Sequence, residues 1–277
     1  MKTILITGCS SGIGRCVAEG LRARGYRVFA TARKPEDVAT LDRLGFAAHL
    51  LDLNDSVSIH SAVEWVLQQT GGTLDALFNN GAYGQPGALE DLDRAALREQ
   101  FETNVFGTHE LTRLLLPVMH RQGHGRVIQN SSVLGFVALP YRGAYVASKF
   151  ALEGLTETLR LEWRGSRIHF VLIEPGPITT RFRHNATQAF KRHVNVATSR
   201  HQERYRIMEA HFQHKAQQGG GRFSLPPEAV LAKVVHALES PTPRVRYGVT
   251  LPTHLFAWLR RLLPRRAMDA LLARAWL

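Results

Sequence analysis

Near its start the chain reads Ile4-Leu5-Ile6-Thr7-Gly8-Cys9-Ser10-Ser11-Gly12-Ile13-Gly14. A short apolar run therefore passes through a glycine-rich turn into a segment of helical period. Glycines at this G-x-x-x-G-x-G spacing let the backbone turn tightly and approach a pyrophosphate, which the N–H groups and dipole of the following helix stabilise. The alternative, glycines that serve only helix–strand packing, requires the strand, turn and helix to coincide by accident. We therefore predict a phosphate-binding turn.

Short apolar runs alternate with longer helical segments as far as about Leu238. This alternation is typical of a parallel sheet. Strands are expected at Thr3–Thr7, Arg27–Thr31, Ala47–Leu51, Leu74–Asn79, Arg126–Asn130, Ile168–Glu174 and Val245–Val249. Helices are expected near Gly12–Arg24, Val57–Gln69, Asp93–Met119, Tyr145–Trp163 and Pro227–Leu238. No Pro- or Ser-rich linker and no internal repeat divides the sequence, so we predict one doubly wound α/β domain of the Rossmann type over residues 1–277.

The composition is that of an ordinary globular protein, with 44% apolar and 21% charged residues among 277. These fractions exclude disordered and collagen-like chains. Two cysteines, Cys9 and Cys16, are too few for a disulfide framework or a four-ligand zinc site, and they suit a reducing cytoplasm. No segment reaches the roughly 18 unbroken apolar residues of a membrane span. We expect a cytoplasmic protein without a bound metal.

The net charge of +12 is concentrated toward the C-terminus. Residues 244–277 carry seven arginines against the single acid Asp269 and so supply half of the excess. No RNP aromatic signature, zinc-finger spacing or basic zipper accompanies them, so we expect no nucleic-acid partner. At about 252–277 the arginines interleave with leucines and tryptophans. We expect this basic amphipathic segment to cover the core, the substrate entrance or a subunit partner, with peripheral membrane contact as the alternative.

Two further segments are expected to bound a substrate site at the carboxyl ends of the strands. Residues 184–222 are polar, contain five histidines and end in three glycines, which predicts a mobile lid. The segment 133–141 is apolar at most positions. Its apolar and aromatic members are Leu134, Phe136, Val137, Leu139 and Tyr141. Together they favour an apolar substrate over a sugar.

The choice of cofactor is expected to depend on the residues that follow the second strand. An acidic residue there accepts hydrogen bonds from a ribose 2′-OH, whereas a basic residue pairs with a 2′-phosphate. The chain reads Thr31-Ala32-Arg33-Lys34, and its first acid, Glu36, comes after Pro35 has turned the backbone. A guanidinium binds phosphate bidentately, so Arg33 favours NADP. Lys34 either adds a point charge or is simply an exposed cation.

A tyrosine and a lysine, Tyr145 and Lys149, stand four residues apart at the start of a helical segment. Residues at i and i+4 share one face of a helix. A cation within about 4–6 Å lowers the pKa of a phenol, ordinarily about 10, by roughly 1–3 units. Tyr145 would then be a usable general acid or base. Alone, however, this spacing is common on ordinary helices.

The complete set of motifs favours a catalytic role for Tyr145 and Lys149 over an ordinary structural one. In chain order they are Thr7-Gly8-x-x-x-Gly12-x-Gly14, Asn79-Asn80, Asn104, Ser132 and Tyr145-x-x-x-Lys149. The sequence thereby resembles the short-chain dehydrogenases/reductases over nearly its whole length, and especially NADP-dependent members such as 17-beta-hydroxysteroid and retinol dehydrogenases and bacterial aldehyde reductases. The resemblance implies that Ser132, thirteen positions before the tyrosine, binds the substrate carbonyl. It also implies that the backbone carbonyl of Asn104 holds a proton-relay water beside Lys149.

The same resemblance implies a set of cofactor-binding residues. They are Gly8, Ser10, Ser11, Gly12, Ile13, Gly14, Arg33, Asp52, Leu53, Asn80, Tyr145, Lys149, Pro175, Gly176, Ile178 and Thr180. Within this set Asp52 would contact adenine, or else cap the next helix, and Ser11 would assist the 2′-phosphate. The usual Asn-Asn-Ala-Gly is replaced by Asn79-Asn80-Gly81-Ala82, a departure that concerns the local loop contacts.

The resemblance thus implies an NADP(H)-dependent oxidoreductase that interconverts an apolar aldehyde or ketone and its alcohol by hydride transfer. Tyr145 would serve as the general acid or base, with Asn104, Ser132 and Lys149 as its catalytic partners. A homo-oligomer is also expected from the resemblance. The alternative function is a non-catalytic protein of the same fold that senses NADP or acts as a scaffold.

Overall fold

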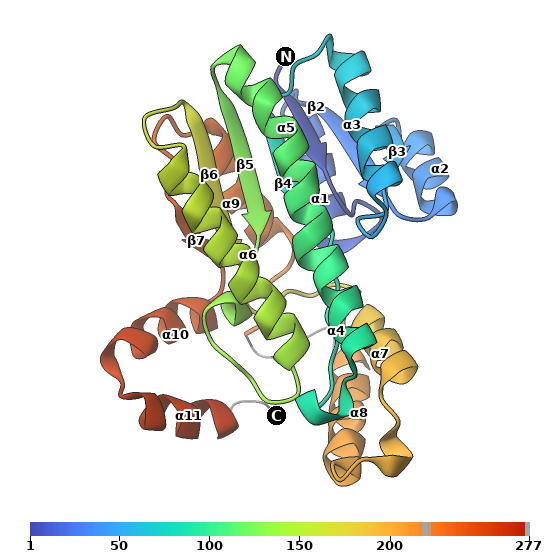
Figure 1. Cartoon of the computed structure of the whole chain (residues 1–277), viewed down its shortest axis with the longest axis vertical. Helices are drawn as coiled ribbons and strands as arrows, with labels where there is room; N and C mark the ends of the chain where they lie inside the picture. The colour runs from blue at the N-terminus through green and yellow to red at the C-terminus, as the bar shows by residue number, and fades with distance from the viewer. Residues whose placement is uncertain (218–220, 222, 275–277) are drawn as a thin grey trace.

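Seven parallel strands form one sheet in the computed structural model, which describes residues 1–217, 221 and 223–274 (Figure 1). Their order across the sheet is β3-β2-β1-β4-β5-β6-β7. The strands are β1 (Thr3–Ile6), β2 (Arg27–Ala32), β3 (Ala47–Leu50), β4 (Ala76–Asn79), β5 (Gly125–Asn130), β6 (Ile168–Glu174) and β7 (Arg246–Gly248). All seven expected strands are therefore present, with ends that differ by at most two residues. The chain order reverses beside β1, and open α/β sheets bind ligands at such a switch point.

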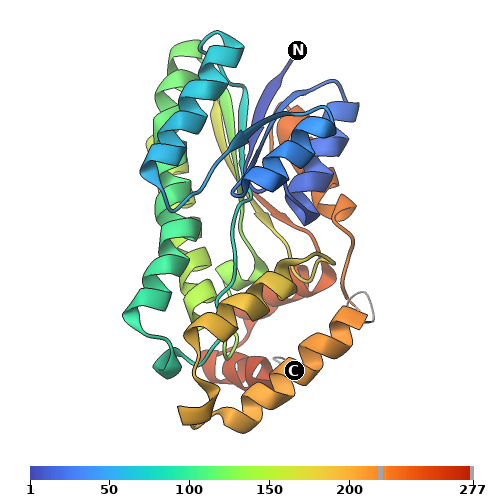
Figure 2. The same cartoon turned by 90° about the vertical axis from the view of Figure 1, so that its right-hand side faces the viewer.

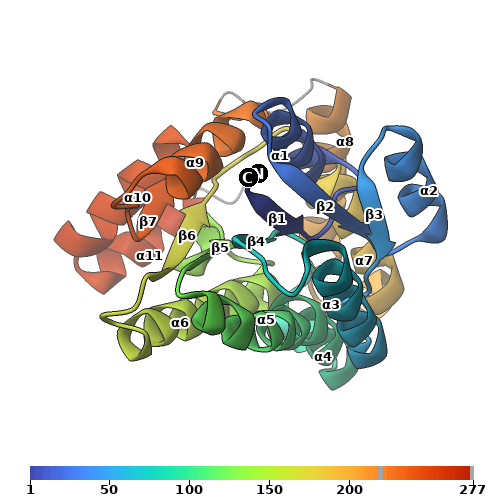
Figure 3. The same ribbon diagram turned by 90° about the horizontal axis from the view of Figure 1, so that it is seen from above.

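Helices cover both faces of the sheet, as Figure 3 shows from above. One face carries α1 (Gly12–Ala23), α2 (Pro35–Arg43) and α9 (Glu228–Glu239), and the other carries α3 (Ser56–Thr70), α5 (Thr108–Gln122) and α6 (Gly143–Glu162). Alternation along β1 explains the two cores: Ile4 and Ile6 pack against α1 and α9, while Leu5 packs against α3 and α5. Each of these β1 side chains is fully buried. The predicted doubly wound Rossmann fold is confirmed.

Four more helices lie beyond the carboxyl ends of the strands (Figures 1 and 2). They are α7 (Phe182–His193), α8 (Gln202–Gln217), α10 (Leu251–Leu262) and α11 (Arg265–Arg274). The expected lid is thus largely helical, with the short 3-10 turn η4 (Val196–Thr198) between α7 and α8. The last part of that lid, residues 218–220 and 222, lies outside the described residues, as do residues 275–277 of the basic segment. Within the described part of the chain, no helix is long and apolar enough to cross a membrane.

The helix expected over Asp93–Met119 is divided. It consists of α4 (Arg94–Phe101), the π-helical turn η2 (Glu102–Gly107) and α5. Two more 3-10 turns, η1 (Leu89–Asp91) and η3 (Val133–Gly135), precede α4 and α6. π-Helical turns are rare and occur frequently at functional sites. A periodicity argument could not locate this one, because its apolar pattern continues that of the flanking helices.

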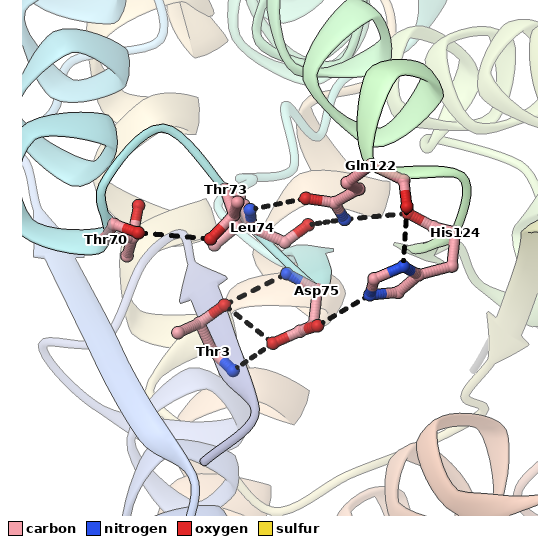
Figure 4. A network of polar contacts seen from close by, with 7 residues as sticks. All are labelled: Thr3, Thr70, Thr73, Leu74, Asp75, Gln122 and His124. Atoms are coloured by element: carbon pink, nitrogen blue, oxygen red, sulfur yellow. Dashed lines mark hydrogen bonds and ion pairs between the residues drawn. The ribbon is translucent and has the colours of Figure 1, made fainter.

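A network of polar groups lies at the amino edge of the sheet (Figure 4), which is the edge opposite to α7 and α10 in Figure 1. The carboxylate of Asp75 accepts from the backbone N–H of Thr3 at 2.7 Å and from its hydroxyl at 2.9 Å. The ring of His124 contacts the other carboxylate oxygen of Asp75, also at 2.9 Å. The side-chain amide of Gln122 accepts from the backbone N–H of Leu74 and donates to its carbonyl oxygen. These contacts join the starts of β1, β4 and β5.

Candidate active site

The glycine-rich turn is held by close backbone packing. Gly8 has φ +72°, a conformation that side chains other than glycine rarely adopt. A Cβ at Gly14 would lie 2.2 Å from the carbonyl oxygen of Gly8 and 2.6 Å from Nδ2 of Asn80. That amide donates to the carbonyl oxygens of Thr7, at 2.9 Å, and of Gly8. Asn80 therefore supports the turn from the end of β4, on the opposite side of the switch point.

The start of α1 faces a cavity of about 390 Å³. Ser11, the residue that precedes α1, makes no side-chain capping hydrogen bond, so the first N–H groups of the helix are not bound by it. The predicted residues that line the cavity are Gly8, Ser10, Ser11, Gly12, Ile13, Asn80, Ser132, Tyr145, Lys149, Pro175, Gly176, Ile178 and Thr180. Gly14, Arg33, Asp52, Leu53 and Asn104 are not among the lining residues. The turn and the Tyr145 helix thus meet at one cavity.

Ser132 and Tyr145 approach each other across this cavity. Ser132 follows β5 and caps η3, because its Oγ accepts the backbone N–H of Leu134 at 3.1 Å. Ser132 therefore also has a structural role as a cap. The same hydroxyl hydrogen-bonds to Tyr145. The hydroxyl of the adjacent Ser131 instead donates to Oε1 of Glu153 at 2.7 Å, away from Tyr145.

Lys149 lies on the same buried face of α6 as Tyr145. Its Nζ donates to the backbone oxygen of Asn130 at 2.7 Å and lies 5.7 Å from the centroid of the Tyr145 ring. Burial raises the pKa of Tyr145 to about 12, although the hydrogen bond from Ser132 opposes this shift. Burial also lowers the pKa of Lys149 to about 8, against the attraction of Glu153. The pKa of Tyr145 therefore does not fall below its ordinary 10, as the spacing of Tyr145 and Lys149 predicted, because desolvation of the buried phenolate is the largest effect on it.

Asn104 lies in the π-helical turn η2 and is almost fully buried. Its Nδ2 donates to the carbonyl of Tyr83 at 2.9 Å and to Oγ of Ser148 at 3.0 Å. Its Oδ1 accepts the N–H of Tyr83. Ser148 in turn donates to the backbone carbonyl of Tyr145 at 2.8 Å. The asparagine side chain therefore connects η2 with the loop after β4 and with the first turns of α6.

Arg33 is exposed directly after β2. It forms no ion pair with a carboxylate of the described residues, whereas Lys34 lies 3.6 Å from the carboxylate of Glu36. Asp52 accepts the N–H of Asn54 at 3.0 Å and so stabilises its own turn, while the cap of α3 is Asp55. Asp55, and not Asp52, therefore caps α3.

Leu53 is a buried packing residue in the described structure. A Cβ at Gly107, the last residue of η2, would lie only 1.8 Å from the carbonyl oxygen of Leu53. The loop after β3 therefore packs its backbone directly on the π-helical turn. This contact fixes the position of the loop that holds Asp52 relative to the switch point.

Comparisons with known proteins agree with this geometry. The family described as short chain dehydrogenase matches residues 2–191. The chain belongs to the short-chain dehydrogenase family. It is 43% identical over 273 residues to an uncharacterized oxidoreductase, YbbO, of Escherichia coli K12, covering 98% of this chain and 94% of the relative. It is 35% identical over 262 residues to human 17-beta-hydroxysteroid dehydrogenase type 1, covering 89% and 77%.

A solved structure of a short-chain dehydrogenase from Streptomyces avermitilis shares the fold, with a TM-score of 0.75 at 29% identity over 97% of this chain and 95% of that one. The protein is thus an oxidoreductase of a family that binds a nicotinamide cofactor. Among the residues that the structure describes, those at this cavity are suited to binding a dinucleotide. No side chain of Ser11 caps the first N–H groups of α1 at the cavity, and the buried Oδ1 of Asn130, a lining residue, has no hydrogen-bond partner.

Asn130 is one functional position that sequence reasoning missed in this dehydrogenase. Its Nδ2 donates to Oδ1 of Asn80 at 3.0 Å, and its backbone oxygen accepts from Lys149. It joins the ends of β4 and β5 beside the Tyr145 helix. An asparagine at the end of a buried strand was the signal that could have found it, because asparagine is depleted in strands.

A second missed feature is a carboxylate cluster behind Ser131. Arg246 of β7 bonds to Glu153 at 2.7 Å, to Glu157 at 2.6 Å and to Glu174. Glu153 is buried and lies one turn after Lys149. The cluster therefore fixes α6, the helix that carries Tyr145 and Lys149, against β6 and β7. Acidic residues within the buried strand β6 and the buried face of α6 were the available signals.

The helices beyond the strands supply the remaining walls. The ring of Phe182 in α7 packs edge-on against Tyr145 with centroids 5.4 Å apart. The fully buried Tyr205 of α8 accepts the N–H of Ala88 at 2.9 Å and donates to Asp91. These contacts anchor the region predicted as a mobile lid to the loop after β4. The cavity wall nearest Tyr145 is apolar as a result.

Proposed function

We propose that the protein is an NADP(H)-dependent dehydrogenase that interconverts an apolar aldehyde or ketone and its alcohol. The observation that carries this proposal is the convergence of Ser132, Tyr145 and Lys149 on the cavity that the glycine-rich turn also lines. A phenol, a hydroxyl and an ammonium group at one cavity are the groups that a carbonyl reduction needs for proton transfer and polarisation.

When bound, NADPH supplies the hydride that adds to the carbonyl carbon. Ser132 donates a hydrogen bond to the carbonyl oxygen. Tyr145, whose raised pKa keeps it protonated, then gives its proton to that oxygen as charge develops. Lys149 stabilises the phenolate that remains, and its link to Asn130 holds it in place.

The role proposed for Asn104 is to position the start of α6 and to support the path by which the proton is resupplied. Its side-chain bonds hold the π-helical turn against Tyr83 and Ser148. π-Helical turns release backbone carbonyls from the regular helical ladder, which supports a carbonyl that binds a relay water.

Arg33 supports the choice of NADP. It is exposed at the end of β2, next to the switch point, without a described carboxylate partner, and no acid occupies its position. A guanidinium there can pair bidentately with a 2′-phosphate. Gly8, Ser10, Gly12 and Gly14 of the turn, together with Ser11, would hold the phosphates, and Asp52 and Leu53 would border the adenine.

The apolar walls support a hydrophobic substrate. Leu134, Leu139 and Phe182 line the cavity beside Tyr145. The name of the human relative, a 17-beta-hydroxysteroid dehydrogenase, is consistent with a bulky apolar substrate of the same kind. Pro175, Gly176, Ile178 and Thr180 would hold the nicotinamide at the other wall.

The test follows nicotinamide absorbance while purified protein and NADPH or NADH meet a panel of apolar aldehydes and ketones. We expect oxidation of NADPH, and a loss of at least about a hundredfold in kcat for Tyr145→Phe, because the proton donor is removed. Bound NADPH without turnover on any carbonyl of the panel would instead support the sensor or scaffold function. Failure of both cofactors to bind would overturn the assignment of the turn.

Cofactor choice is tested separately by Arg33→Asp. We expect NADPH to bind at least about tenfold more weakly and NADH to bind equally well or better, because a carboxylate repels the 2′-phosphate. Lys34→Asp is the matched control, since that side chain is already paired with Glu36. An unchanged ratio of NADPH to NADH affinity in Arg33→Asp would contradict the assignment.

A further inference from the structure

One face of α10 carries an apolar stripe that the fold does not cover. Its members are Leu251, Leu255, Trp258 and Leu262, which are 67%, 51%, 63% and 71% exposed. The spacing of i, i+4, i+7 and i+11 places them along one side of the helix. We call this set the outer stripe. Four large apolar side chains in one row are more than the scattered exposure that soluble surfaces normally show.

The opposite face of α10 already accounts for the packing of this helix. Phe256, Ala257, Leu259 and Leu263 pack against a buried cluster that includes Met268 and Leu272 of α11. The same cluster contains Leu134, Phe136 and Tyr145. The hairpin of α10 and α11 therefore holds itself to the apolar wall of the active site by its inner side. The outer stripe is not needed for that contact.

Arginines gather at the end of α10 and the start of α11. Residues 251–274 contain five arginines and one acid, Asp269. Arg261, Arg265 and Arg266 are exposed and form no ion pair with a carboxylate of the described residues. Arg260 lies on the other side of α10, with its guanidinium 5.8 Å from the centroid of the Phe150 ring. Arg261 directly precedes Leu262, the last member of the outer stripe, and α11 begins with Arg265 and Arg266 three and four residues after it, so unpaired positive charge follows this end of the stripe.

We propose that the outer stripe docks on the surface of an anionic lipid bilayer, with α10 lying in the interface plane. Leucine side chains enter the acyl boundary, Trp258 lies at the headgroup level, and the long arginine side chains reach the lipid phosphates. A second copy of the chain fits this face less well, because it would bring two sets of unpaired arginines together. This proposal does not depend on the proposed reaction.

Flotation of the full-length protein with vesicles tests the proposal. We expect it to float with vesicles of phosphatidylcholine containing 30% phosphatidylglycerol, and to float far less with phosphatidylcholine alone. Raising the salt from 50 to 500 mM should release most of the bound protein, because the arginine contribution is screened. Tryptophan emission should shift to shorter wavelength on binding, and the shift should be reduced in Trp258→Phe but kept in Trp65→Phe.

Two variants separate the contribution of the outer stripe from that of the neighbouring arginines. L255Q/L262Q should lower the vesicle partition coefficient about tenfold or more through lost apolar burial. R261Q/R265Q/R266Q should lower it on the order of a hundredfold, at roughly fivefold per arginine. Two controls remove groups of the same kind elsewhere. Leu161→Gln removes a leucine side chain that is 69% exposed on α6, and R43Q/R94Q/R121Q removes three exposed arginines. Both should float like the wild type. Unchanged thermal unfolding keeps each comparison valid.

Three results would overturn the proposal. The first is the absence of flotation with any vesicle, and the second is equal flotation of the wild type and both stripe variants. The third is a change of oligomeric state in L255Q/L262Q, measured by light scattering without lipid, which would show that a second copy covers the stripe.

Discussion

The two edges of the sheet use polar side chains in opposite ways. At the amino edge, the polar groups of Thr3, Asp75 and His124 bind one another (Figure 4). At the carboxyl edge, the buried Oδ1 of Asn130 has no partner, and Lys149 is desolvated beside an open cavity. Saturated groups stabilise a fold, whereas groups with unused bonding capacity at a cavity bind and transform a ligand.

The largest effect is expected where backbone packing forms the carboxyl edge. Gly14→Ala should destabilise the protein by about 3 kcal/mol and abolish NADPH binding, because the new Cβ meets the backbone oxygen of Gly8 at 2.2 Å. Urea unfolding and fluorescence titration with NADPH measure the two effects. Gly154→Ala is the control: a Cβ there meets nothing within 4 Å, so helix propensity should raise stability by about 0.5–1 kcal/mol. Similar behaviour of the two variants would show that the close approach of residue 14 to the backbone of Gly8 is not the cause of the destabilisation.

At Lys149 we expect a smaller change in stability than at Gly14, and a substitution there should raise stability while it lowers activity. Lys149→Met should abolish turnover but stabilise the fold at pH 7 by roughly 1–3 kcal/mol, because the buried ammonium group is lost. The pKa of Lys149 is lower in the folded protein, at about 8, than its ordinary 10.5. Its charge therefore costs stability below pH 8, and this cost disappears as the pH rises toward 10.5.

Urea unfolding at pH 7 and at pH 10 measures this pH dependence. The gain in Lys149→Met should shrink at the higher pH, and the exposed Lys191→Met should show no gain at either. In the wild type, kcat/KM for carbonyl reduction should fall as the pH rises through about 8. A stability gain that is independent of pH would contradict the charge as its origin.

The smallest effect is expected at the amino edge. Asp75→Asn should destabilise the protein by about 1 kcal/mol at pH 7, a modest value because the carboxylate is partly exposed, and should leave turnover unchanged. Hydrogen bonds from His124 and Thr3 hold the pKa of Asp75 below its ordinary 3.8 despite partial burial. Its contribution is therefore present above pH 4 and is lost as the pH falls through the lower value.

Urea unfolding at pH 7 and pH 3 is the measurement for Asp75→Asn, with the exposed Asp42→Asn as the matched control. Loss of activity in Asp75→Asn at unchanged stability would contradict the division between the two edges.

The fold was predictable because its signals are local. Apolar period along the chain located the seven strands, and the glycines at the start of α1 indicated the turn. Tyr145 and Lys149 share a helix face whatever surrounds them. The helices α7 and α8 were not predictable in the same way, because their polar sequences gain structure from distant partners. Tyr205, for example, bonds to Ala88 and Asp91, more than a hundred residues earlier in the chain.

Other properties of the site arise only when distant residues meet. The bond between Arg246 and Glu153 joins residues 93 positions apart, and no spacing rule connects them. The pKa of Tyr145 depends on burial, which the whole fold produces and which outweighs the hydrogen bond with Ser132. Backbone conformation and side-chain period act within a few residues, so they can be deduced from the chain. Desolvation and charge pairing act through space, so only the assembled sheet and its helices could decide them.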